Sequence, residues 1–155
     1  MTRLTDEQKH DNARERMLQK FREYTLTRCK NKTAQVWQRL VRLQAIEPDG
    51  LVSCITCDWR GSHKDCDAGH FVPRRHSSTI FHPNNCHVQC RACNDHLSGN
   101  MAAYRLFIET TYGVEQVEEL ERLKQEVKQF TKEELVDLRM DLMARIKIAE
   151  RKLSQ

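Results

Sequence analysis

The N-terminal part of the chain carries apolar side chains at helical spacing on a charged background. The apolar positions recur at intervals of four, four and three residues, at Ala13, Met17, Phe21 and Tyr24. Thr5-Asp6-Glu7-Gln8 has the form of a capping box, because the Thr5 hydroxyl and the Gln8 side chain can satisfy free N–H groups at a helix start. The pattern predicts a helix over about residues 6–28 whose apolar stripe packs in the core.

A second helical stretch follows after a short gap. The pattern predicts a helix over about residues 33–46, ended by the turn sequence Pro48-Asp49-Gly50. Its apolar positions are Val36, Trp37, Leu40, Val41 and Leu43. We interpret these positions, like those of the first helix, as core rather than as ligand contacts.

The helical period returns in the C-terminal third. It runs from Met101 through Ile108 and breaks at Gly113. Thr131-Lys132-Glu133-Glu134 is a second capping box and predicts a helix to the C-terminus. That helix carries an apolar stripe of Leu135, Leu138, Leu142, Ile146, Ala149 and Leu153. The stripe either docks inward or pairs with a second subunit.

The segment between these helical parts has a different character. Leu51–Ile55 and Ala68–Val72 are short runs that favour strands, and Arg91–Leu97 has room for a helix start. Six of the seven cysteines and six of the seven histidines fall within residues 51–100. The chemistry of the protein is therefore expected in this segment.

Composition limits the class of protein. A chain of 155 residues, with 39% hydrophobic and 31% charged residues, suits one modest domain with much solvated helix surface rather than a large cofactor-enclosing enzyme. We find neither an apolar run of about 20 residues nor a signal peptide, so we expect a soluble protein that does not enter a membrane. Residues 1–53 hold 11 basic against 7 acidic residues, a modest excess that would suit a polyanion but is also common for solubility.

Two C-x-x-C pairs predict a metal site. Cys54 and Cys57 form the first pair, and Cys90 and Cys93 form the second. Four thiolates at this spacing are typical of a structural, tetrahedral Zn²⁺ site that would join the two ends of the intervening segment. Redox chemistry is the alternative, but it normally uses one such pair in a βαβ setting that we do not find here. We interpret Cys29, Cys66 and Cys86 as spare thiols, keeping Cys66 and Cys86 as alternative ligands.

The residues between and after the pairs resemble a known nuclease motif. The run contains His70, then Asn85 fifteen residues on, then Asn94 directly after the second C-x-x-C pair. This order resembles the His-Asn-Asn form of the HNH, or His-Me finger, nucleases. More narrowly, CITC…DAGH…NCHVQCRACNDHLSGN is similar to the NinG (Rap) type of recombination endonuclease of lambdoid phages. The resemblance covers roughly residues 50–112.

The chemistry of phosphodiester hydrolysis agrees with this resemblance. A base must deprotonate water and a cation must offset charge on the phosphate. His70 suits the base, because its ordinary pKa of about 6.5 leaves it largely neutral at physiological pH. The resemblance implies that Asn85 holds the loop and orients the His70 ring through a carbonyl contact, and that Asn94 binds a catalytic Mg²⁺ or Mn²⁺ through its amide oxygen.

The sequence departs from the usual HNH pattern at two positions. HNH proteins place a metal ligand directly before the base, and here that residue is Gly69. We choose Asp67 as the substitute, because residues two apart on a strand project to the same side. Glycine at 69 would also allow a close approach of backbone or DNA. Leu97 stands where lysine is usual, which removes one expected phosphate contact.

Other histidines and arginines near the motif leave alternatives open. His87 and His96 match histidines of the NinG-type pattern, and each could bind the catalytic metal or pack beside the cysteines. Arg74 and Arg75 follow the proposed base, and guanidinium groups there could clamp phosphates. Arg91 is a weaker candidate for the same DNA contact. His63, His76 and His82 are expected on surface loops.

We therefore expect a mostly helical α+β protein with a zinc-stapled ββα-metal (HNH, His-Me finger) core at residues 50–112. A basic helical region at 1–49 and a second helical region at 113–155 would complete one compact unit. The resemblance implies a metal-dependent endonuclease that cuts branched DNA, such as Holliday junctions and D-loops, in phage recombination. It also implies the cytoplasm of the bacterial host and host or phage recombination proteins as partners.

Two other functions fit the same residues, and the oligomeric state is open. One is a RecA-dependent HNH nuclease similar to phage Ref. The other is a non-catalytic zinc module that binds DNA and recruits recombination proteins. A homodimer formed by the terminal helices would match the two-fold character of branched DNA.

Overall fold

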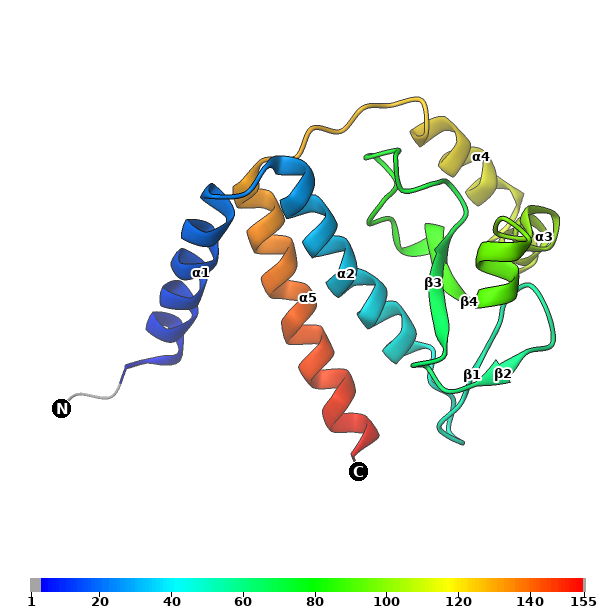
Figure 1. The fold of residues 1–155 in the computed structure, drawn as a ribbon, viewed down its shortest axis with the longest axis horizontal. Coiled ribbons are helices and arrows are strands. Elements are labelled where there is room, and N and C mark those ends of the chain that lie inside the picture. Colours follow the sequence, from blue (N-terminus) through cyan, green and yellow to red (C-terminus); the bar gives the residue numbers. More distant parts are fainter. Residues whose placement is uncertain (1–3, 155) are drawn as a thin grey trace.

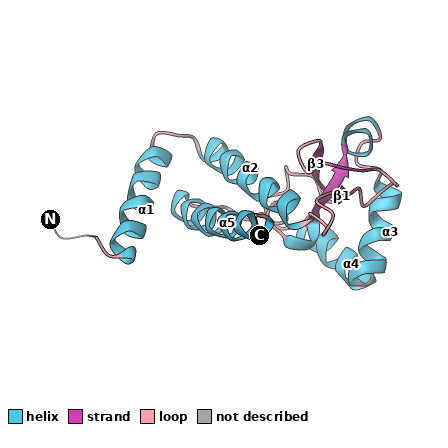
Figure 2. Ribbon diagram, turned by 90° about the horizontal axis from the view of Figure 1, so that it is seen from below, coloured by secondary structure: helices cyan, strands magenta, loops and turns pink. Residues whose placement is uncertain are grey.

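A row of three helices lies beside a small hairpin, and a second pair of helices lies on the far side of that hairpin (Figure 1). The computed structural model describes residues 4–154. The helices of the row are α1 (Asp6–Arg22), α2 (Leu26–Gln44) and α5 (Lys132–Leu153). The far pair is α3 (Met101–Tyr112) and α4 (Val114–Leu123). Seen from below, α1 stands apart at the N-terminal end of the row, crossing the direction of α2 and α5 (Figure 2).

The predicted helix over 6–28 is wrong at its C-terminal end. The chain leaves the helix at Glu23, and α2 begins at Leu26 rather than at residue 33. Thr25 is the physical reason, because its extended backbone and its hydroxyl, which accepts from the Arg28 N–H at 3.2 Å, start a new helix. An apolar pattern continues across such a short turn and does not reveal it.

The apolar stripe of α5 docks inward on α2. Leu142 and Ile146 pack against Trp37, Leu40 and Leu43 in one buried cluster. Ala68 and Cys86 of the hairpin complete this cluster, so one face of the hairpin packs against α2 and α5. The chain itself covers the stripe that could have paired with a second subunit from Leu135 to Ala149, and Leu153 at its end stays exposed.

The predicted helix boundaries around the capping boxes are confirmed. Thr5 and Thr131 each accept from the backbone N–H three residues on, and the side chains of Gln8 and Glu134 accept from the cap N–H groups in return. Gly113 separates α3 from α4 with φ of +95°, a conformation that suits glycine.

Among the residues that the structure describes, no helix combines the length and the apolar character needed to cross a bilayer.

The central segment forms two small antiparallel sheets. β1 (Val52–Ser53) pairs with β2 (Arg60–Gly61), and β3 (Cys66–His70) pairs with β4 (Cys86–Cys90). The strand expected over Ala68–Val72 thus lies two residues earlier. A short 3-10 helix, η1 (Pro83–Asn85), precedes β4, and a π-helix, η2 (Ala92–His96), follows it.

The two faces of the β3–β4 hairpin have different surroundings. Ala68 and Cys86 face α2 and α5, where they join the core described above. Asp67 and Gly69 belong to the other face, because side chains alternate along a strand. The register places Gln89 opposite Asp67 and His87 opposite Gly69, so these four residues share that face.

Candidate metal centre and catalytic pocket

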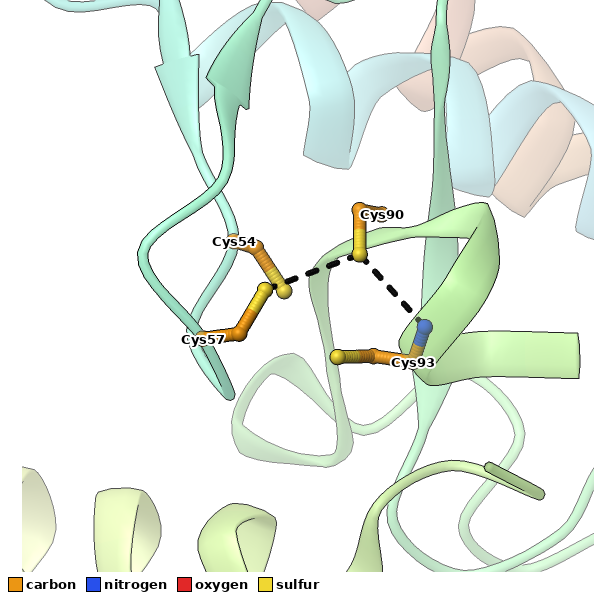
Figure 3. A group of neighbouring side chains, drawn as sticks. All are labelled: Cys54, Cys57, Cys90 and Cys93. Carbon is orange, nitrogen blue, oxygen red and sulfur yellow. Dashed lines mark hydrogen bonds between the residues drawn. The ribbon is translucent and has the colours of Figure 1, made fainter. Parts of the chain in front are cut away.

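The four cysteines of the two C-x-x-C pairs come together at one end of the hairpin (Figure 3). Their sulfur atoms all lie within 4.8 Å of one another. The N–H of Cys93 donates to the sulfur of Cys90 at 3.4 Å, and the N–H of Trp59 donates to that of Cys57 at 3.5 Å. Backbone donors of this kind stabilise thiolate ligands. The cluster could therefore hold a metal ion such as zinc.

The other three cysteines lie outside this cluster. Cys66 donates to the carbonyl of His63 and Cys29 to that of Phe21, both at 3.5 Å. Cys86 is buried in the α2–α5 core, and burial raises the pKa of its thiol to about 12. The structure thus gives no support to Cys66 or Cys86 as alternative ligands of the cluster.

Asp67 and Asn94 meet beside the cluster. Asn94 lies in η2, where the N–H of Leu97 reaches back to the carbonyl of Ala92 at 3.0 Å and widens the turn. From this position the Asn94 Nδ2 donates to the Asp67 Oδ2 at 3.2 Å. The structure therefore brings together the two residues that we predicted as ligands of the catalytic metal. Carboxylate and amide oxygens suit Mg²⁺ and Mn²⁺, so this donor set fits the predicted ion.

His70 ends β3 and is mostly buried. Its Nε2 lies 3.0 Å from the carbonyl oxygen of Ile80, which can only accept, so the neutral ring donates from Nε2. The other nitrogen, Nδ1, is then the basic one, and it lies 3.8 Å from the sulfur of Cys86. Burial lowers the pKa of His70 to about 4; the Ile80 carbonyl raises it in part and the positive charge of Arg74 lowers it further. The imidazole is thus held neutral in one tautomer.

Asn85 fastens the loop that supplies the Ile80 carbonyl. Its buried side chain accepts from the Val72 N–H at 2.7 Å and donates to the carbonyls of Val72 and Thr79, both at 3.0 Å. The prediction that Asn85 holds the loop agrees with these contacts. Asn85 was also predicted to orient the His70 ring through a carbonyl contact. In the structure, the carbonyl that contacts His70 belongs to Ile80, and Asn85 binds the neighbouring Thr79 carbonyl.

His87 is placed as a packing residue. Its Nδ1 lies 3.1 Å from the hydroxyl of Tyr104, and its Nε2 lies 3.0 Å from that of Tyr112. Tyr104 donates its own proton to the carbonyl of Gly69 at 2.9 Å, so it accepts from His87. In this arrangement neither ring nitrogen of His87 is free for a metal. Burial, followed by the nearby His70, lowers the pKa of His87 to about 4.

A surface pocket of about 430 Å³ opens beside His70 and Asn94. Arg75 and Lys124 also line it and bring positive charge to its rim, together with the acidic Glu121. Arg74 and Arg91 are exposed but do not line the pocket, and the same holds for His96. Of the predicted DNA contacts, the structure therefore brings Arg75 to the pocket.

Several residues that line this pocket or make contacts around it were not among the predicted site residues. Lys124 comes from α4, far along the chain, and Ile80 acts through its backbone, so no sequence signal marks them. Tyr104 lies inside the helical period from Met101 through Ile108, which gives no signal of function. Gln89 had a usable signal, since it is a polar residue two positions after His87 on a strand.

Comparison with known sequences identifies relatives in bacteriophages. Residues 2–152 match the sequence family described as Bacteriophage Lambda NinG protein. "Protein ninG" of Escherichia phage lambda is 35% identical over 85 residues, which cover 54% of this chain and 41% of that relative. "Protein ninG" of Salmonella phage P22 is 34% identical over 85 residues, with the same coverage. "Protein ninG" of Enterobacteria phage H19B is 39% identical over 56 residues, 36% of this chain and 28% of the relative.

The match to these relatives is partial in length. The chain spans about two fifths of the length of the lambda and P22 proteins. The comparison with solved structures found no match to this chain.

Proposed function

The chain belongs to the bacteriophage lambda NinG protein family, and we propose that it is a metal-dependent endonuclease that hydrolyses phosphodiester bonds of branched DNA during phage recombination. One observation carries the proposal. A neutral, oriented His70 and the amide of Asn94 line the same basic-rimmed pocket, and Asn94 is hydrogen-bonded to the Asp67 carboxylate. A base, hard oxygen ligands and phosphate-binding charge are the parts that phosphodiester hydrolysis requires.

His70 acts as the general base in this proposal. Because Nε2 donates to the Ile80 carbonyl, Nδ1 is the atom that would take a proton from the attacking water, which would replace the long 3.8 Å contact of Nδ1 with the Cys86 thiol. As the ring becomes positive, the Ile80 carbonyl stabilises the Nε2–H, while Asn85 keeps the supporting loop in place. These contacts give the ring one orientation without a carboxylate partner.

Asp67 and Asn94 would hold Mg²⁺ or Mn²⁺. The bound cation would supply positive charge at the scissile phosphate and the leaving 3′ oxygen. Arg75 and Lys124 would bind neighbouring phosphates from the rim of the pocket, which favours recognition of backbone and shape rather than of bases. The cysteine cluster would keep the hairpin and η2 together and take no part in the reaction.

Cleavage of a labelled four-way junction and a matched duplex tests this proposal. The reactions contain Mg²⁺, Mn²⁺ or EDTA, with wild type, His70→Ala and the matched control His10→Ala on the exposed face of α1. We expect cutting that needs the cation, prefers the junction and falls about 10²- to 10⁴-fold in His70→Ala only. Gel-shift binding with no cutting by any of the proteins would favour the non-catalytic DNA-binding module.

The same assay separates the remaining predictions. Cutting that requires added RecA filaments would favour the RecA-dependent nuclease. The homodimer stays a prediction, and mass measurement of the free protein and of its junction complex tests it. Recombination proteins of the host or phage as partners also stay a prediction.

A further inference from the structure

Gln89 carries a buried amide oxygen that has no hydrogen-bond partner among residues 4–154, which the structure describes. The residue is fully buried in β4. Its Nε2 donates to the Gly99 carbonyl at 2.8 Å and to the Thr56 hydroxyl at 3.0 Å. Because a carbonyl oxygen can only accept, the contact with Gly99 fixes which end of the amide is Nε2. The Oε1 atom therefore points the other way, and it has no donor.

Such an atom requires an explanation, because a buried polar group left unsatisfied costs about 1–3 kcal/mol. A leucine or methionine of similar size would fill the same space without that cost. The two Nε2 contacts explain why the side chain is ordered. They do not explain why the Oε1 atom points into a region where no N–H or O–H group donates a hydrogen bond to it.

The oxygen is turned toward Gly69 and Asn94. A Cβ atom built on Gly69 would lie 2.1 Å from Gln89 Oε1 and 2.9 Å from Asn94 Oδ1. Both amide oxygens thus border the space that the glycine leaves open. Any side chain at position 69 would displace them, which gives a physical reason for glycine where HNH proteins usually have a ligand.

The same place is next to Asp67. Gln89 lies directly opposite Asp67 in the β3–β4 register, so the two side chains leave the hairpin on one face. Asn94 donates from Nδ2 to Asp67, which leaves its Oδ1 on the side of Gly69. The two amide oxygens therefore border the space at Gly69, and the Asp67 carboxylate lies next to them, hydrogen-bonded to Nδ2 of Asn94. Oxygen ligands of this kind, with no positively charged partner, are typical of a site for a hard divalent cation.

We propose that Gln89 is a third oxygen ligand of the divalent cation that Asp67 and Asn94 bind, and that Gly69 keeps the space for this ligand. This inference rests on the proposed function for the identity of the cation, Mg²⁺ or Mn²⁺. It assigns to β4 a part in the site that otherwise involves β3 and η2 alone.

Binding of Mn²⁺ to the zinc-loaded protein, measured by electron paramagnetic resonance without DNA, tests the inference. Gln89→Met keeps the length of the side chain and removes the oxygen, and we expect it to weaken Mn²⁺ binding at least tenfold. Gln89→Glu keeps an oxygen at this position, and we expect it to bind Mn²⁺ more tightly than Gln89→Met. Gln38→Met is the matched control, because Gln38 donates to the Ala68 carbonyl of β3 from α2 and should leave Mn²⁺ affinity unchanged.

Folding is checked for each variant by zinc content and circular dichroism. If Gln89→Met does not fold, Gly69→Ala replaces it, since the added methyl group displaces Oε1 without removing a polar group; the same loss of Mn²⁺ affinity is expected. A folded Gln89→Met or Gly69→Ala that binds Mn²⁺ like wild type overturns the inference. So does a wild-type protein that binds no Mn²⁺.

These outcomes are distinct from those of the cleavage assay. A protein that binds Mn²⁺ through Gln89 but cuts no DNA contradicts the proposed function and leaves the ligand assignment standing. A protein that cuts DNA with a cation but does not need Gln89 for Mn²⁺ affinity supports the proposed function and contradicts the assignment of Gln89 as a ligand.

Discussion

The cysteine cluster and the oxygen group at Asp67 are two candidate metal sites that lie at neighbouring places on one hairpin and differ in construction. The four sulfurs come from two C-x-x-C turns and already lie within 4.8 Å of one another. The oxygens come from β3, β4 and η2, and one of them, Gln89 Oε1, has no hydrogen-bond partner in the described part of the chain. The first group is closed and soft, which suits structural zinc, whereas the second borders a pocket and offers hard ligands. In the function that we propose, the first site would stabilise the fold and the second would perform the chemistry.

Removal of a cysteine ligand should have the largest effect. Structural zinc contributes on the order of 10–16 kcal/mol of apparent binding free energy in small domains at pH 7. We expect Cys93→Ser to lose zinc and to unfold the segment from β1 to η2, while α2 and α5 keep their own apolar contacts. Hydrogen exchange with mass spectrometry locates the change.

Cys29→Ala is the control for this prediction. Cys29 is buried against α1 and α5, outside the cluster, so its loss should leave zinc content unchanged. A Cys93→Ser protein with full zinc content and unchanged exchange in the hairpin would contradict the structural role.

The oxygen group should respond differently. We expect Asp67→Ala to keep its zinc and its fold and to lose cation-dependent cleavage about 100-fold or more, because even changes outside the ligand shell commonly cost 10- to 100-fold. Asp65→Ala, an exposed carboxylate on the same chain segment, is the matched control and should cut normally. Loss of zinc in Asp67→Ala would remove the distinction between the two sites.

The sequence predicts the soft site better than the hard one, for a physical reason. A C-x-x-C turn brings two sulfurs together by itself, so Cys54, Cys57, Cys90 and Cys93 follow from local spacing. The hard site depends on tertiary contacts, since the polar character of Gln89 marks it only as a strand residue on the face of His87, and the register places it opposite Asp67. Likewise, Lys124 reaches the pocket from α4, and nothing in its local sequence marks it.

The helices likewise combine features that local sequence determines with features that depend on tertiary contacts. The capping boxes at Thr5 and Thr131 act within one turn, and both were predicted correctly. The break before Thr25 was missed, because the apolar period continues across it and a lone threonine is a weak helix start signal. The sequence alone does not identify the partner of the α5 stripe, because an apolar face can pack equally well on α2 or on a second subunit, and only the tertiary structure shows that it packs on α2.

The pH dependence of cleavage sharpens the assignment of His70. Only the neutral ring accepts a proton, and burial holds the pKa of His70 at about 4. We expect the cleavage rate to stay level from pH 7.5 down to about pH 5.5, where a histidine with the ordinary pKa of about 6.5 would already lose most of its activity. A fall of about fivefold between pH 6.5 and pH 5.5 with zinc retained, as the ordinary pKa of about 6.5 gives, would contradict this environment.

The same shift sets the acid limit of that experiment. The unfolded chain protonates His70 near pH 6.5 while the folded chain does not, so the stability that the neutral ring contributes is complete above pH 6.5 and is lost as the pH falls toward 4. Zinc content is therefore measured at each pH, so that loss of the cysteine cluster is not mistaken for titration of the base.

Arg75 should give the smallest effect. It lines the pocket but is exposed, and an exposed charge pair contributes at most about 1 kcal/mol, so Arg75→Ala should weaken junction binding about fivefold or less. If Arg75 contacts a phosphate, the log–log slope of affinity against salt concentration should fall by about one, and duplex and junction should be affected alike. Lys20→Ala, on the exposed face of α1, is the control and should leave the slope unchanged. A loss confined to cleavage, with binding and salt slope intact, would instead place Arg75 with the reacting phosphate and extend the hard site to the rim of its pocket.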